Sequence, residues 1–163
     1  MMDALSPMEI ANLDAVVQIE QQVYEFPWSR NHFVDSLAAG HWAFVIRHPV
    51  LPNSCLTGYY LAMLILDEVH LLNMTVDVPY QGQGLGHSML KDFIGRSIQL
   101  GAKSLWLEVR QSNRRAQHIY QDVGFSKIAT RPHYYPSAHM KREDAVLMKM
   151  KIENLHESSY GLV

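Results

Sequence analysis

The spacing of hydrophobic positions changes along this 163-residue chain. Near the N-terminus, around residues 85–98 and around residues 116–123, apolar side chains recur every three or four positions, which predicts amphipathic helices. Other segments are rich in aromatic and branched side chains, which is typical of strands. We expect strands at residues 41–47, 57–66, 69–78, 104–109, 125–130 and 145–150.

Residues that begin or end helices support these boundaries. Asn12, Ser29 and Asn113 each precede a helical segment and can accept hydrogen bonds from its first N–H groups. Gly101 and Gly124 follow helical segments and can end them in the left-handed conformation. The order of the elements predicts an α/β or α+β fold with a mixed sheet.

Length and composition are those of one globular domain, which we expect over residues 1–151, with a flexible polar tail at 152–163. A formal charge of −2 gives no broad reason to expect direct nucleic-acid binding. No apolar run is as long as a membrane span and no secretion signal is apparent, so we expect a cytoplasmic protein without a membrane partner. The single Cys55 excludes an internal disulfide, and the nine histidines lack metal-ligand spacing, so no metal is expected.

A glycine-rich segment, Gln81-Gly82-Gln83-Gly84-Leu85-Gly86, lies between an expected strand and the helix after it. Glycines let the backbone approach a ligand closely, and the first N–H groups of a helix are unpaired, so the segment suits a pyrophosphate. A tight turn without a ligand would also explain the glycines. The nucleotide-hydrolase phosphate loop does not match, because no Lys-Ser or Lys-Thr follows. A dinucleotide motif is a distant alternative, because its third glycine would come one residue early.

The pattern Gln81-x-x-Gly84-x-Gly86 resembles the pyrophosphate loop of the GNAT N-acetyltransferases, and residues 73–80 are similar to the strand that leads into it. The resemblance implies a mixed, mostly antiparallel sheet of about seven strands flanked by about four helices, with acetyl-CoA as the cosubstrate. Gly82 departs from the family pattern, because many members of the family carry a basic residue at this position. The coenzyme contacts that the resemblance implies are Met74, Thr75, Val76, Gly82, Gln83, Gly84, Leu85, Gly86, His87 and Asn113.

Other motifs are similar to the branch of this family that acetylates the N-terminal alanine of ribosomal small-subunit protein eighteen. They are Phe26-Pro27-Trp28-Ser29, Leu105 to Arg110, Asn113, Tyr120, Gly124-Phe125, Tyr134-Tyr135-Pro136 and Arg142 to Ala145. The resemblance implies that the acceptor is a protein N-terminus, that of a ribosomal protein. It also implies that Trp28, Tyr134 and Tyr135 lie beside the acceptor in two aromatic loops, although such loops can equally pack against the fold.

Acetyl transfer to an amine needs a base for the amine proton and benefits from an acid for the departing thiolate. Alternation places Glu108 on the strand face opposite Leu105, Leu107 and Val109, where we expect partial desolvation. The pattern alone supports equally a catalytic base and an ion pair with Arg110 or another partner. The family resemblance favours the base.

Tyr120 is the candidate acid by the same resemblance, although its helical spacing from Ala116 is also typical of core packing. Two other functions stay open. One is a GNAT enzyme that acetylates a lysine side chain, a small molecule or aminoacyl-tRNA. The other is a non-enzymatic binder of coenzyme A or a dinucleotide.

Overall fold

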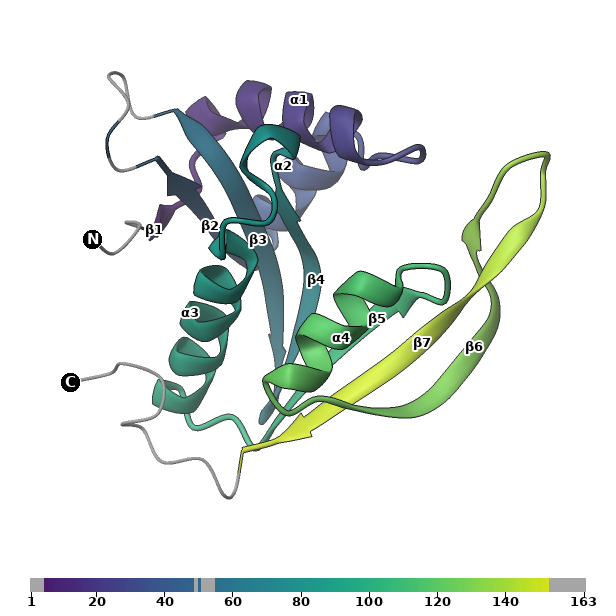
Figure 1. Cartoon of the computed structure of the whole chain (residues 1–163). Helices are drawn as coiled ribbons and strands as arrows, with labels where there is room; N and C mark the ends of the chain where they lie inside the picture. Colours follow the sequence, from purple (N-terminus) through teal and green to yellow (C-terminus); the bar gives the residue numbers. More distant parts are fainter. Residues whose placement is uncertain (1–4, 49, 51–54, 153–163) are drawn as a thin grey trace. The chain divides into compact units, whose positions relative to one another are not determined.

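The computed structural model describes residues 5–48, 50 and 55–152, and within these residues the chain forms seven strands and four α-helices (Figure 1). The strands form one mixed sheet in the order β1-β2-β3-β4-β5-β7-β6. This confirms the predicted fold class. The chain divides into two compact units, Met1–Leu64 with Leu72–Phe93 and Ile65–Leu71 with Ile94–Val163.

The first unit holds the N-terminal elements, in which β1, β2 and β3 pair antiparallel. Ser29 caps the second helix as predicted, because its Oγ accepts a hydrogen bond from the His32 N–H at 3.3 Å. Asn12 precedes the first helix, but its Oδ1 accepts from the Glu9 N–H at 2.8 Å. The elements are β1 (Leu5–Pro7), a 3-10 turn (Ile10–Asn12), α1 (Leu13–Val23), α2 (Arg30–Ala38), β2 (Trp42–Arg47), nearly all of β3 (Leu56–Ile65), the end of β4 (Glu68–Val76), a second 3-10 turn (Val78–Tyr80) and the start of α3 (Leu85–Gln99).

Strand β3 is buried on both faces in this unit. Tyr59 and Leu61 belong to a core cluster that includes Val16 of α1 and Phe33 of α2. Tyr60 lies between Tyr59 and Leu61 and so points to the opposite face of the strand, where its ring centre is 6.0 Å from that of Phe93 in α3. A Cβ on Gly58 would lie 2.7 Å from the carbonyl oxygen of Thr75 and 3.2 Å from the Cε of Met89. A glycine is therefore required where β3, β4 and α3 meet.

The second unit contains the first residues of β4, the end of α3, β5 (Ser104–Arg110), α4 (Arg114–Asp122), β6 (Ser126–Pro136) and β7 (Arg142–Lys151). Strand β5 is parallel to β4 and antiparallel to β7, which pairs antiparallel with β6. The predicted alternation is confirmed, since Leu105, Leu107 and Val109 are buried and pair in register with Met150, Met148 and Val146.

The segment Tyr134–Pro136 corrects a prediction, because it ends β6 instead of forming a loop. Arg131 is in register with Ala145 and Tyr135 with Glu143, so the three residues between Arg131 and Tyr135 oppose Asp144 alone. At this bulge His133 adopts a left-handed φ of 52°, and its N–H donates to Asp144 Oδ1 at 2.9 Å. Bulges of this kind redirect side chains.

The predicted tail begins with Ile152, which is buried and donates its N–H to the carbonyl oxygen of Lys103 at 3.0 Å. The rest of that segment, residues 153–163, lies outside the described residues. Within the described part of the chain, no helix combines the length and apolar character that a membrane crossing requires.

Candidate active site

The glycine-rich turn presents open backbone at the start of α3. Gly82 and Gly84 adopt left-handed φ values of 77° and 86°, and residues 81–84 are exposed. The first helical hydrogen bond runs from the Ser88 N–H to the carbonyl oxygen of Gly84 at 3.0 Å. A Cβ built on Gly84 would meet nothing within 4 Å. The turn thus fits an anionic group that approaches its N–H donors closely.

Two glutamines brace this turn. The side-chain amide of Gln81 donates to the carbonyl oxygen of Val76 at 3.0 Å, and that of Gln83 donates to Pro79 at 3.3 Å. Leu85 is buried, whereas His87 is exposed. The Gln81 contact ties the turn to the end of β4. The predicted coenzyme residues of the glycine turn and those of β4 are therefore connected within the first unit.

The end of β4 carries polar contacts of its own. Thr75 is 2% exposed, and its Oγ1 bonds to the hydroxyl of Tyr24 at 2.9 Å and to Asn73 Oδ1 at 2.9 Å. The Tyr24 hydroxyl also donates to the carbonyl oxygen of Met74 at 3.4 Å. A carbonyl oxygen has two lone pairs, so the side-chain contacts from Tyr24 and Gln81 do not by themselves saturate the carbonyls of Met74 and Val76.

The segment between α1 and α2 contains the first predicted acceptor residue, Trp28. Its ring lies 5.4 Å from Phe33 and 5.7 Å from His32, so the side chain packs partly into the core edge. Its backbone N–H donates to Glu20 Oε1 at 2.9 Å. Phe26 is 39% exposed, so this neighbouring ring presents more surface to a ligand than Trp28 does.

Glu108 is contacted by two β6 side chains in the second unit. Arg131 Nη1 lies 3.2 Å from Glu108 Oε1, and the Glu108 side chain is 22% exposed. A hydrogen bond to Glu108, burial and the charge of Glu108 raise the pKa of the Tyr134 hydroxyl, so that hydroxyl stays a donor. The Arg131 guanidinium also lies 5.5 Å from the Tyr134 ring centre. The carboxylate is partly desolvated as expected, and its ion-pair partner is Arg131.

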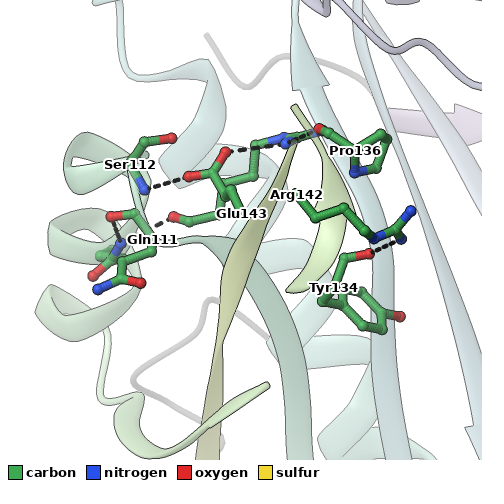
Figure 2. A network of polar contacts seen from close by, with 8 residues as sticks. Gln111, Ser112, Tyr134, Pro136, Arg142 and Glu143 are labelled. Atoms are coloured by element: carbon green, nitrogen blue, oxygen red, sulfur yellow. Dashed lines mark hydrogen bonds and ion pairs between the residues drawn. The ribbon is translucent and has the colours of Figure 1, made fainter. Parts of the chain in front are cut away.

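A polar network fixes the end of β6 (Figure 2). Arg110 donates to the carbonyl oxygen of Pro136 at 2.8 Å and to Glu143 Oε1 at 3.0 Å. Glu143 Oε2 accepts from the Ser112 N–H at 2.9 Å, and Arg142 donates to the carbonyl oxygen of Tyr134 at 2.7 Å. Although burial favours the neutral acid, the hydrogen bonds from Ser112 and the contact with Arg110 lower the pKa of Glu143.

Tyr134 and Tyr135, the two tyrosines predicted to flank the acceptor, each lie against an arginine side chain. The Arg110 guanidinium lies 4.6 Å from the Tyr135 ring centre, and the rings of Tyr134 and Tyr135 pack edge to face at 4.9 Å. Of the predicted site residues in the second unit, the structure therefore brings Glu108 and Tyr134 into contact and puts Tyr135 next to them.

The helix α4 carries the other two predicted residues of this unit. Asn113 caps it as expected, with Oδ1 accepting from the Ala116 N–H at 3.1 Å. Tyr120 is partly buried, with its ring 6.0 Å from Phe125. This packing agrees with the structural alternative for Tyr120, and its catalytic role stays a prediction.

Sequence reasoning missed Glu20 and Arg131, two charged residues that contact the predicted site. A carboxylate on the apolar face of α1 was a usable signal for Glu20, because Val16 and Val23 flank it at helical spacing. Arg131 gave no such signal. Among the residues that the structure describes, no group of three or more histidine, cysteine, aspartate or glutamate side chains is placed to hold a metal ion.

Comparison with known proteins decides the family. The model of the acetyltransferase (GNAT) family matches residues 13–125, which is more than half of the chain. The chain belongs to the GNAT acetyltransferase family. Within that family it is similar to the [ribosomal protein bS18]-alanine N-acetyltransferase of Escherichia coli strain K12, with 35% identity over 151 residues, 93% of this chain and 99% of the relative.

A second relative and two solved structures extend the comparison. The enzyme of the same name from Haemophilus influenzae is 32% identical over 90% of this GNAT chain and 97% of the relative. The crystal structure of the E. coli ribosomal-protein-S18-alanine N-acetyltransferase has a TM-score of 0.83 over 95% of this chain and 99% of that one. Arabidopsis thaliana NAA60, solved with acetyl-CoA, has a TM-score of 0.82 at 15% identity, which shows a shared fold alone.

Proposed function

We propose that this GNAT enzyme moves the acetyl group of acetyl-CoA to the α-amine of an N-terminal alanine on the ribosomal protein that corresponds to bS18. The observation that carries the proposal is the 35% identity to the E. coli bS18-alanine N-acetyltransferase, which spans 93% of this chain and 99% of that enzyme. A ribosomal-protein acceptor would place the reaction in the cytoplasm.

The proposed coenzyme site in the first unit is the glycine turn together with the end of β4. The N–H groups from Gly82 to His87 would hold the pyrophosphate, supported by the positive end of the α3 dipole. The backbone of Met74, Thr75 and Val76 would pair with the pantetheine arm. Asn113, which caps α4, is proposed as a further coenzyme contact from the second unit.

Glu108 is the proposed base that takes a proton from the acceptor ammonium, so that the neutral amine can attack the thioester carbon. The amine nitrogen then forms the amide bond while the carbon–sulfur bond breaks, and the nitrogen releases its second proton to water. Tyr120 is the proposed acid that returns a proton to the departing thiolate. An ionised carboxylate offers about four acceptor positions, so the contacts from Arg131 and Tyr134 leave room for an ammonium or a bridging water.

The preference for an α-amine has a physical reason. An α-amine has a pKa of about 8 and a lysine side chain one of about 10.4, so more of the α-amine is neutral at pH 7. A single carboxylate base therefore manages the α-amine more easily. Trp28, Tyr134 and Tyr135 are the proposed residues that flank the acceptor peptide.

The test is an acceptor panel with purified protein and acetyl-CoA, analysed by mass spectrometry. The panel holds a peptide that begins with alanine, the same peptide beginning with leucine, an internal-lysine peptide with a blocked N-terminus, and spermidine. We expect the alanine peptide to be acetylated fastest, at its first residue. Faster acetylation of lysine or spermidine would instead support the alternative function, a GNAT enzyme that acetylates another amine. Thermal stabilisation by NAD and not by acetyl-CoA would exclude both.

A further inference from the structure

A carboxylate lies in the core of the first unit. Glu20 of α1 is 2% exposed and follows the buried residue Ile19. Its Oε1 accepts from the Trp28 backbone N–H at 2.9 Å, and its Oε2 accepts from the Tyr59 hydroxyl and from Asn73 Nδ2 at 3.1 Å. Three donors around two acceptor oxygens are what a buried carboxylate needs. Burial and the charge of Glu20 raise the pKa of Tyr59, so its hydroxyl stays a donor.

The partners of Glu20 belong to both predicted binding segments of this unit. The segment 24–28, which we call the acceptor segment, bonds to Glu20 at both ends. The Tyr24 N–H donates to the Glu20 carbonyl oxygen at 3.0 Å, and the Trp28 N–H donates to its carboxylate. Residues 25–27 between these anchors are exposed and lie outside any helix or strand. The start of the acceptor segment is therefore held by the last helical hydrogen bond of α1, and its end is held by the Glu20 side chain.

The same carboxylate is connected to the coenzyme strand. Asn73 donates to Glu20 and accepts from the Thr75 hydroxyl at 2.9 Å. Thr75 in turn bonds to the hydroxyl of Tyr24, at the start of the acceptor segment. A closed chain of hydrogen bonds thus joins α1, the acceptor segment and the end of β4.

We propose that Glu20 is a positioning residue for the acceptor peptide, because its carboxylate sets the path of the acceptor segment relative to β4. This role rests on the proposed function, in which that segment flanks the incoming N-terminus. The glycine turn has separate braces in Gln81 and Gln83, so the loss of the Glu20 anchor should spare the grip on the coenzyme phosphates.

The experiment compares four variants for coenzyme Kd, peptide KM and kcat. Glu20→Ala removes the acceptor oxygens. Glu20→Asp keeps the charge but withdraws them by about 1.5 Å, one carbon–carbon bond. Glu20→Gln keeps one oxygen for the Trp28 N–H. Tyr59→Phe is the matched control, because it removes a donor from the same carboxylate and leaves the Trp28 contact intact. Hydrogen exchange at the Trp28 amide follows the anchor independently of activity.

We expect Glu20→Ala and Glu20→Asp to raise peptide KM by at least about tenfold, with faster exchange at Trp28 and an acetyl-CoA Kd within about twofold of wild type. Glu20→Gln should stay within about threefold in peptide KM, and Tyr59→Phe within about twofold. If Glu20→Ala does not fold, the Asp variant carries the test.

Two results would overturn the inference alone: a peptide KM for Glu20→Asp equal to that of Tyr59→Phe, or a parallel rise in peptide KM and coenzyme Kd. Either would mean that the carboxylate only stabilises the core. A wild-type protein that acetylates no alanine peptide is a different result. It would remove the proposed function and, with it, the acceptor role of Glu20.

Discussion

Replacing Gly84 with alanine separates backbone strain from ligand crowding, because Gly40 offers a matched control. The two glycines have left-handed φ values of 86° and 77°, and a Cβ added at either meets nothing within 4 Å. An L-residue in that conformation costs about 1–2 kcal/mol. For a protein of this size the loss corresponds to a Tm lower by roughly 2–8 °C. Both variants should lose this much stability, since neither creates a clash inside the protein.

Only Gly84 lies in the proposed pyrophosphate turn, where a methyl group would take space that the phosphates need. We expect Gly84→Ala to raise the Kd of acetyl-CoA by at least about tenfold, or about 1.4 kcal/mol. Gly40→Ala should leave it within about twofold. At a coenzyme concentration about 100 times the wild-type Kd, acetyl-CoA stabilises the wild type by about 2.7 kcal/mol and a tenfold weaker variant by about 1.4 kcal/mol.

Titration calorimetry measures the two Kd values, and thermal unfolding with and without acetyl-CoA measures the stabilisation. The opposite result would be that Gly84→Ala binds acetyl-CoA as tightly as Gly40→Ala does while both variants lose similar stability. In that case the glycines of the turn serve the backbone alone and the coenzyme phosphates lie elsewhere.

Four further predictions concern the second unit. Glu108→Gln should keep coenzyme Kd and lower kcat by about 10²–10⁴-fold, and steady-state kinetics on a folded variant with near-normal kcat would remove Glu108 as the base. Tyr120→Phe should lower kcat within the same range of about 10²–10⁴-fold, whereas a change in Tm without one in kcat would indicate core packing alone. Arg131→Gln should lower kcat by less than Glu108→Gln does, because the carboxylate loses one contact that orients it; equal losses would show that the ion pair is itself essential. Because the pKa of Glu143 is lowered in the folded state, its contribution to stability is present above the unfolded-state pKa of about 4.3 and is lost as pH falls through the folded-state pKa. The Tm of Glu143→Gln should therefore fall less than that of wild type between pH 5 and pH 3. Parallel curves of Tm against pH would contradict this.

Local sequence signals predicted the elements well because they act over a few residues. Ser29 caps α2 by accepting from the N–H three positions further along the chain, and Gly124 ends α4 with a φ of 114°. The alternation at Leu105, Leu107 and Val109 follows from strand geometry alone. The glycine-rich turn before α3 was predicted from its place between a strand and a helix, and the structure adds that Gly84 is left-handed there.

Other features depend on residues that meet only in the folded chain. The pattern could not choose the ion-pair partner of Glu108. Arg110 is engaged by Glu143, and Arg131 reaches Glu108 from β6, two strands away. The bulge before Tyr135 has the same origin, because its left-handed residue is held by Asp144 on β7. Strand β1 has three residues, too few for a periodic pattern.

Two peptides of one sequence show whether the acceptor is an N-terminal α-amine. Both begin with alanine and contain an internal lysine, and in one the N-terminus is blocked. Initial rates with acetyl-CoA, and the modified position in each product, are measured by mass spectrometry. We expect rapid acetylation of the free peptide at its first residue and little reaction of the blocked one. Acetylation of the blocked peptide on lysine, as fast as that of the free peptide at its N-terminus, would contradict this expectation.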